Sequence, residues 1–97
     1  MPCLEILPAV MEDFDRFLDH MLAHDAADAA QRIGEIVNAL DLLVAHPLIG
    51  RPVAHDHREL VLGRGTRGYV ALYQYLPELD TVFILAIRSQ REAGYAR

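Results

Sequence analysis

The chain has 97 residues, of which 53% are hydrophobic, and a formal net charge of −5. This length suits one domain, residues 1–97, and excludes a cofactor domain beside a separate substrate domain. No uncharged apolar stretch is long enough to cross a membrane, and the N-terminus lacks the pattern of a secretory signal, so we expect a cytoplasmic protein. The single cysteine, Cys3, excludes a disulfide framework and a cysteine-based zinc site.

Charge is distributed unevenly along the chain. Residues 1–50 carry nine acidic residues and two arginines, whereas residues 51–97 carry five acidic residues and seven arginines. Arginine supplies all of this positive charge because the chain has no lysine, and the planar guanidinium favours bidentate contacts with carboxylate or phosphate. GC-rich codon usage also explains missing lysines, but not the gathering of arginines in the second half. We therefore expect functional contacts to come from those arginines.

The first half of the sequence predicts a short strand and two helices. Residues 3–7 form the strand, and Pro8 begins a helix at a position where its missing N–H costs little. Apolar residues then recur at spacings of three and four to about His24, which is typical of one helical face. Asp25 can cap a second helix, which must end before Pro47 because the residue before a proline avoids the α region. The short connection between the helices predicts an antiparallel hairpin.

The second half predicts a loop and three strands. Two prolines and one glycine in residues 46–52 indicate the loop. Strands rich in β-branched and aromatic residues are predicted at 59–62, 69–76 and 81–87, with a hairpin turn at 77–80. The predicted fold class is therefore α+β, in the order β-α-α-β-β-β. The helical hairpin packs on one face of a small, mainly antiparallel sheet.

The strands at 69–76 and 81–87 are apolar on both faces. Val70 and Leu72 lie on one side of the first of them, with aromatic residues on the other side. One helical hairpin covers only one face of such a sheet, and a soluble monomer rarely exposes a large apolar patch. We expect the C-terminal tail, a second copy or a partner protein to cover the remaining face, with a partner favoured.

Four motifs of the second half resemble the RelE/ParE toxin superfamily, in particular the plasmid-stabilisation type of toxin from bacterial type II toxin–antitoxin systems. They are HPLIGRP (46–52), HRELVLG, GYVALYQY and the ending TVFILAIRSQREAGY. The β-α-α-β-β-β order is also that of the superfamily, so the resemblance extends over nearly the whole chain. It implies a small toxin that needs no cofactor and is held inactive by a cognate antitoxin. A homodimer or a toxin–antitoxin heterotetramer is the implied assembly.

The resemblance leaves two targets open. RelE-like toxins cut messenger RNA on the ribosome without a metal, whereas ParE-like toxins inhibit DNA gyrase by binding it. RNA cleavage needs a base, an acid and cations that stabilise the phosphorane charge. Val70 stands where many active relatives have arginine, Ser89 stands where many have histidine, and we expect no histidine in the sheet. The ParE-like function is therefore favoured, although Glu59 or Tyr95 could replace the base; a non-toxic homodimeric interaction module is a third alternative.

The candidate site residues are arginines and tyrosines of the second half. For a nuclease, the resemblance and the charge pattern indicate Arg58, Arg88, Arg91 and Tyr95. For binding of the antitoxin or the target, they indicate Arg64, Arg67, Tyr69, Tyr73, Tyr75, Arg88 and Arg91.

One further motif was weighed as a metal site. His55 and His57 have a spacing that allows two ligands on an extended segment, with Asp56 or His46 as a third. The same spacing is common in polar loops, so we expect no metal.

Overall fold

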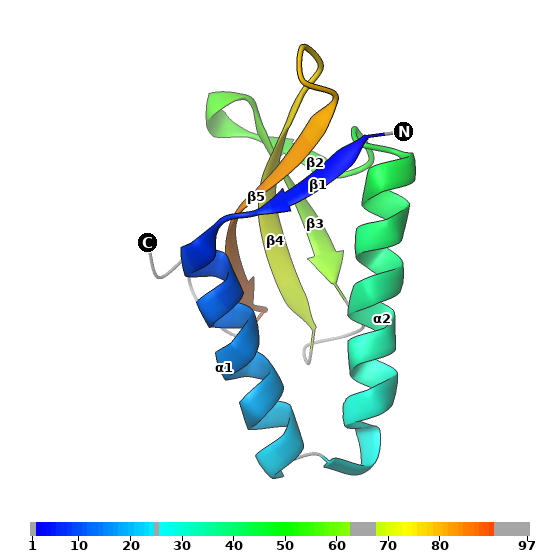
Figure 1. The fold of residues 1–97 in the computed structure, drawn as a ribbon, viewed down its shortest axis with the longest axis vertical. Coiled ribbons are helices and arrows are strands. Elements are labelled where there is room, and N and C mark those ends of the chain that lie inside the picture. Colours follow the sequence, from blue (N-terminus) through cyan, green and yellow to red (C-terminus); the bar gives the residue numbers. More distant parts are fainter. Residues whose placement is uncertain (1, 25, 63–67, 91–97) are drawn as a thin grey trace.

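The computed structural model describes residues 2–24, 26–62 and 68–90. Its elements in chain order are β1 (Cys3–Ile6), α1 (Pro8–His24), α2 (Ala26–Ala45), β2 (Arg51–Val53), the 3-10 helix η1 (Ala54–Asp56), β3 (His57–Leu62), β4 (Tyr69–Leu76) and β5 (Thr81–Ser89). Figure 1 shows α1 and α2 diverging from their connection, with the strands lying between them. The predicted α+β class and β-α-α-β-β-β order are confirmed. Within the described residues, neither helix is long and apolar enough to cross a membrane.

The sheet has five strands in the order β1-β5-β4-β3-β2. Strand β1 runs parallel to β5, and every other neighbouring pair is antiparallel. The short strand β2 was not predicted, because Pro52 and the preceding glycine indicated a loop. Its position at the sheet edge explains why a proline is tolerated there. Strand β3 also begins two residues before the predicted strand, so the expectation of a sheet without histidine was wrong: His57 pairs with Val53 across β2 and β3.

A β-bulge adjusts which residues of β5 face the helices. The β4 partner of Leu72 is Ala86, but the next residue, Tyr73, pairs with Ile84, so Leu85 is an extra residue on β5. Ile84 and Ile87 therefore both belong to the core although they are an odd number of residues apart. Without the bulge, the two-residue alternation of a strand would turn one of them to the opposite face.

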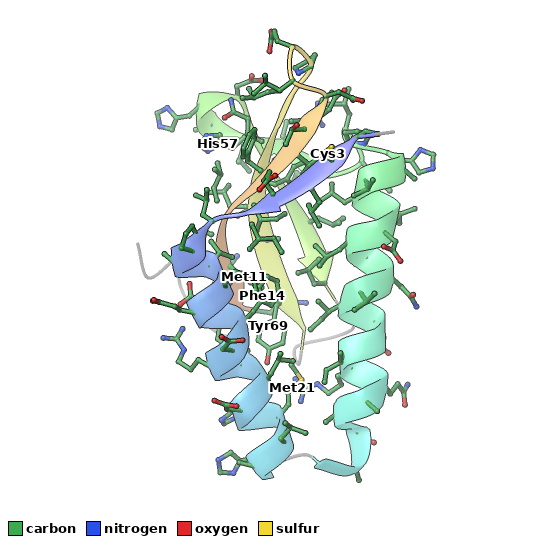
Figure 2. All side chains as sticks on the ribbon, viewed as in Figure 1. Cys3, Met11, Phe14, Met21, His57 and Tyr69 are labelled. Atoms are coloured by element: carbon green, nitrogen blue, oxygen red, sulfur yellow. The ribbon has the colours of Figure 1, made fainter. Side chains whose placement is uncertain are left out.

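The core lies between the helices and one face of the sheet. Phe17 of α1 stacks on Tyr69 of β4 with their ring centroids 4.6 Å apart. Figure 2 shows Met21 and Tyr69 on the inner side of α1. The fully or nearly fully buried core residues are Val10 and Met21 of α1, Ala29, Ile36 and Leu43 of α2, and Leu62, Tyr69, Ala71, Tyr73, Val82, Ile84 and Ile87 of the strands. The buried residues of α2 are seven positions apart, which places them on one side of a 3.6-residue helix.

Neither helix of the described residues covers the opposite face of the sheet. Val70 lies there, since Tyr69 and Ala71 beside it belong to the core, and Ala86 lies there as the register partner of Leu72, two residues from Val70. Val70 and Ala86 are nearly buried without being part of the core cluster. Among the described large apolar side chains of this face, only Val61 is as much as half exposed. The face is therefore apolar, as predicted, but Val70 and Ala86 are less exposed than expected.

The burial of α2 predicts a sharp difference between two adjacent leucines. Leu43 is 0% exposed in the core, whereas Leu42 is 45% exposed. We expect Leu43→Ala to lower the free energy of unfolding by about 2–5 kcal/mol, and Leu42→Ala to change it by less than about 0.5 kcal/mol. Urea unfolding of both variants measures this difference, and equal losses would contradict the placement of α2.

Candidate protein-binding site

The segment between α2 and β2 forms an ordered turn. Pro47 occupies its second position, and the Ile49 N–H donates to the His46 carbonyl oxygen at 3.0 Å. Proline favours this position because its fixed φ suits the first central residue of a type I turn. The turn leaves Leu48 62% exposed and Ile49 45% exposed. We call these two residues the apolar pair.

Three residues hold this turn against the sheet, and we call Gly50, Arg58 and Tyr73 the loop clamp. The Gly50 N–H donates to the Tyr73 hydroxyl oxygen at 2.8 Å. The Arg58 Nη1 donates to the Gly50 carbonyl oxygen at 2.9 Å and to the Leu48 carbonyl oxygen at 3.1 Å. Bonds from a charged guanidinium are stronger than those between neutral groups. The loop clamp thus fixes the backbone on both sides of Ile49.

The loop clamp requires glycine at position 50. A Cβ added there would lie 2.6 Å from the Tyr73 Cε1 and hydroxyl oxygen, and 2.7 Å from the Glu59 carbonyl oxygen. These distances are much shorter than a van der Waals contact. The Tyr73 side chain is fully buried, and the Glu59 carbonyl belongs to the backbone of β3. The close approach of this backbone to Tyr73 is therefore possible only for a residue without a side chain.

The hydroxyl of Tyr73 is a structural acceptor at neutral pH. Burial raises the pKa of Tyr73, and this effect exceeds the lowering by the Gly50 N–H and the Arg58 charge. A tyrosine with a raised pKa stays protonated throughout the neutral range. Tyr73 is consequently unsuited to act as a base there.

A second tyrosine fixes the turn between β4 and β5. The Tyr75 hydroxyl donates to Asp80 Oδ1 at 2.7 Å, and the Cys3 N–H donates to the Asp80 carbonyl oxygen at 2.9 Å. The hydrogen bond to Asp80 raises the pKa of Tyr75, with smaller contributions from burial and from the Asp80 charge. Asp80 itself has a φ of 45°, a conformation that aspartate tolerates better than most residues. The turn also exposes Leu79.

The predicted catalytic residues are not brought together in the described part of the chain. Arg58 pairs in register with Tyr73, on the helix side, whereas Arg88 pairs with Val70, on the opposite face. The Arg88 Nη1 donates to the Ser89 carbonyl oxygen at 3.2 Å. Arg91 and Tyr95 lie outside the described residues.

The predicted binding residues separate into buried and surface positions. Tyr69 and Tyr73 are core residues, so their side chains present no surface to a partner in this structure. Tyr75 is half-buried at the hairpin, as is Arg88 on the open face. Arg64 and Arg67 lie outside the described residues.

Two other candidates have defined surroundings. Glu59, the alternative base, forms an ion pair with Arg51 across β2 and β3. His55 and His57 meet edge to face with ring centroids 6.2 Å apart. Among the described residues, no three His, Cys, Asp or Glu side chains gather closely enough to hold a metal ion.

The apolar pair and Gly50 were not among the predicted site residues. They lie within the HPLIGRP motif that carried the family resemblance. The contact that gives Gly50 its role joins it to Tyr73, which is 23 positions away in the sequence. Periodicity and turn signals describe only local structure, so the motif itself was the one available signal.

Comparison with known protein families gives one match. The family model described as ParE toxin of type II toxin–antitoxin system, parDE, matches residues 4–94. No curated protein matches the chain well enough to count as a relative. The matched range includes the loop clamp, the apolar pair and all five strands except the first residue of β1.

Two glycines of this chain form a matched test of the loop clamp. We expect Gly50→Ala to lower the free energy of unfolding by about 1–3 kcal/mol, because the added methyl group overpacks the contact with Tyr73. Gly34 lies inside α2, and a Cβ there meets no atom within 4 Å. Gly34→Ala should therefore raise the free energy of unfolding by about 0.5–1 kcal/mol. Urea unfolding measures both, and a neutral Gly50→Ala would refute the steric argument.

The two raised tyrosine pKa values predict a loss of stability in alkaline solution. The folded chain holds both phenolic protons more tightly than the unfolded chain, whose tyrosines have pKa values near 10. This stabilisation is fully present below pH of about 10 and is lost as the pH rises through the raised values. Urea unfolding at increasing pH should show the loss, and Tyr75→Phe should make it smaller. Stability that stays constant from about pH 8 to about pH 11 would contradict these pKa directions.

Proposed function

The chain belongs to the ParE toxin family of type II toxin–antitoxin systems, and we propose that it acts by binding and inhibiting DNA gyrase. Membership of this family makes the chain a toxin with an antitoxin as its partner. The choice of gyrase over ribosome-bound messenger RNA is the proposal. The site geometry bears on that choice because cutting RNA requires an assembled set of groups, whereas inhibition by binding requires only a surface.

The observation that carries the proposal is the separation of Arg58 from Arg88. A phosphorane needs cationic groups converging on one phosphate. Arg58 instead directs its Nη1 to two backbone carbonyl oxygens on the helix side, and Arg88 lies on the opposite face. The two described arginines of the candidate nuclease set therefore cannot contact the same phosphate in this structure.

The residues around Arg88 also favour binding over cleavage. Its partner across β4 and β5 is Val70, which is apolar and only 7% exposed. Glu59, the alternative base in the described residues, is engaged by Arg51. Neither position offers the charged, accessible group that proton transfer needs.

The open face of the sheet is the proposed antitoxin surface. It is apolar, neither described helix covers it, and Arg88 lies on it with a side chain suited to an antitoxin carboxylate. In this proposal the toxin acts in the cytoplasm and is stored there as a complex with its antitoxin, for which a heterotetramer is the expected assembly. A homodimer through the same face is the expected form of the free toxin.

A supercoiling assay tests the proposed target. Purified toxin should inhibit supercoiling of relaxed plasmid by gyrase, and an equimolar amount of the antitoxin from the adjacent gene should restore the activity. The reason is that the bulk of a bound antitoxin should keep the toxin from docking on gyrase, so each antitoxin removes one toxin from the binding equilibrium with gyrase.

The opposite result identifies the alternative. Full supercoiling activity at saturating toxin, together with cuts at codon positions in translated messages by primer extension, would reject gyrase inhibition in favour of RNA cleavage. In that case Arg88→Ala should abolish the cuts.

A further inference from the structure

The exposed apolar side chains of the described residues differ in their position in the secondary structure. Most of them stand singly on helices or strands. Leu48 and Ile49 are adjacent in the chain, lie outside any helix or strand, and include the most exposed large apolar residue of the described part. The two side chains gain little burial from folding, and adjacent exposed apolar residues form the kind of surface that often contacts another molecule.

The backbone of this pair is fixed before any partner arrives. The loop clamp bonds the carbonyl oxygen of Leu48 and both backbone polar groups of Gly50, and the Ile49 N–H is bonded within the turn. A preformed loop loses little conformational entropy on binding, which leaves more of the contact energy as affinity. Apolar side chains held rigidly at a protruding position are typical of residues that dominate a protein interface.

We propose that the apolar pair inserts into an apolar pocket of the toxin's folded protein target, and that the loop clamp positions it for that contact. This inference rests on the proposed function to the extent that the target is a protein. It assigns the contact to a surface separate from the open sheet face, on which the antitoxin is proposed to bind.

Charge around the apolar pair indicates the chemistry of the pocket. Arg58 donates its hydrogen bonds to the neutral carbonyl oxygens of Leu48 and Gly50. These bonds do not balance its positive charge, which therefore lies next to the backbone of the apolar pair. Arg51 follows Gly50 directly with a side chain that is 75% exposed and paired with Glu59. Because Glu59 balances the charge of Arg51, the positive charge beside the pair comes from Arg58, and a carboxylate at the border of the pocket is complementary to it. An RNA target would instead match accessible cations without two protruding apolar side chains.

The test replaces the apolar pair and measures three activities. The double variant Leu48→Ser/Ile49→Ser should need at least about tenfold more toxin for half-maximal gyrase inhibition, because two interface anchors are removed. It should also lose growth arrest when expressed without antitoxin. Its affinity for antitoxin, measured by calorimetry, should stay within about twofold of the wild type, because the pair lies outside the antitoxin surface.

Leu79→Ser is the matched control. Leu79 is 61% exposed in the other well-defined turn, so the substitution removes an apolar side chain that is as exposed as Leu48. Gyrase inhibition and growth arrest should be unchanged. An equal loss in this control would show that general surface hydrophobicity causes the effect, which would overturn the proposal.

A second variant tests the positioning role of the loop clamp. Tyr73→Phe removes the acceptor of the Gly50 N–H and leaves the apolar pair intact. Inhibition should weaken by about three- to tenfold, since a loosened loop must be ordered on binding. Hydrogen exchange of the Gly50 amide should become faster in the same variant, which a purely global loss of stability would not produce selectively. Wild-type inhibition with a fast-exchanging Gly50 amide would overturn the positioning role.

The outcomes separate this inference from the proposed function. If the wild-type toxin does not inhibit gyrase, the proposed function fails, and growth arrest still tests the apolar pair against whatever the target is. Growth arrest or RNA cutting that the double variant retains at the wild-type level would overturn the inference. A matching loss of antitoxin affinity would also overturn it, because the pair would then belong to the antitoxin surface.

Discussion

The buried hydroxyl of Tyr73 is the contact on which the arrangement of the proposed site depends. Strand β4 places this side chain in the core, where its hydroxyl oxygen accepts a hydrogen bond from the N–H of Gly50. A residue with a Cβ cannot approach so closely. Arg58, the register partner of Tyr73 on β3, then bonds the neighbouring carbonyl oxygens. The pairing of Arg58 with Tyr73 in the sheet thus fixes the conformation of the turn between α2 and β2.

The single helical layer gives the molecule two different surfaces. On the helix side, the residues of α1, α2 and the sheet form a continuous core, and the loop clamp lies at the edge of that layer. On the other side, the strands present apolar residues that neither described helix covers. For a toxin that must bind both an antitoxin and a target, two separate surfaces allow each contact to be changed without the other. The same separation explains why Arg58 and Arg88 do not act together.

The sequence predicted the elements well where the signals were local. Pro8 and Pro47 bracket the helical pair, and the hairpin turn at 77–80 lies between β4 and β5 as expected. Strand β2 was missed because an edge strand tolerates the proline that indicated a loop. The bulge at Leu85 and the contact between Gly50 and Tyr73 were missed because they depend on how distant segments pair. The alternation of the strand placed Tyr69 and Tyr73 on the face opposite Val70, but it did not show which face the helices cover, so their burial was not predicted.

The measurement that tests the central claim most directly is hydrogen exchange at the Gly50 amide, followed by NMR in the wild-type protein. If the Tyr73 hydroxyl holds this N–H in the folded state, the amide should exchange as slowly as the amides of β4, with an opening free energy close to that of global unfolding. Exchange at the rate of an unstructured loop would mean that the turn is not fixed by the sheet, and the account of how this toxin presents Leu48 and Ile49 would be wrong.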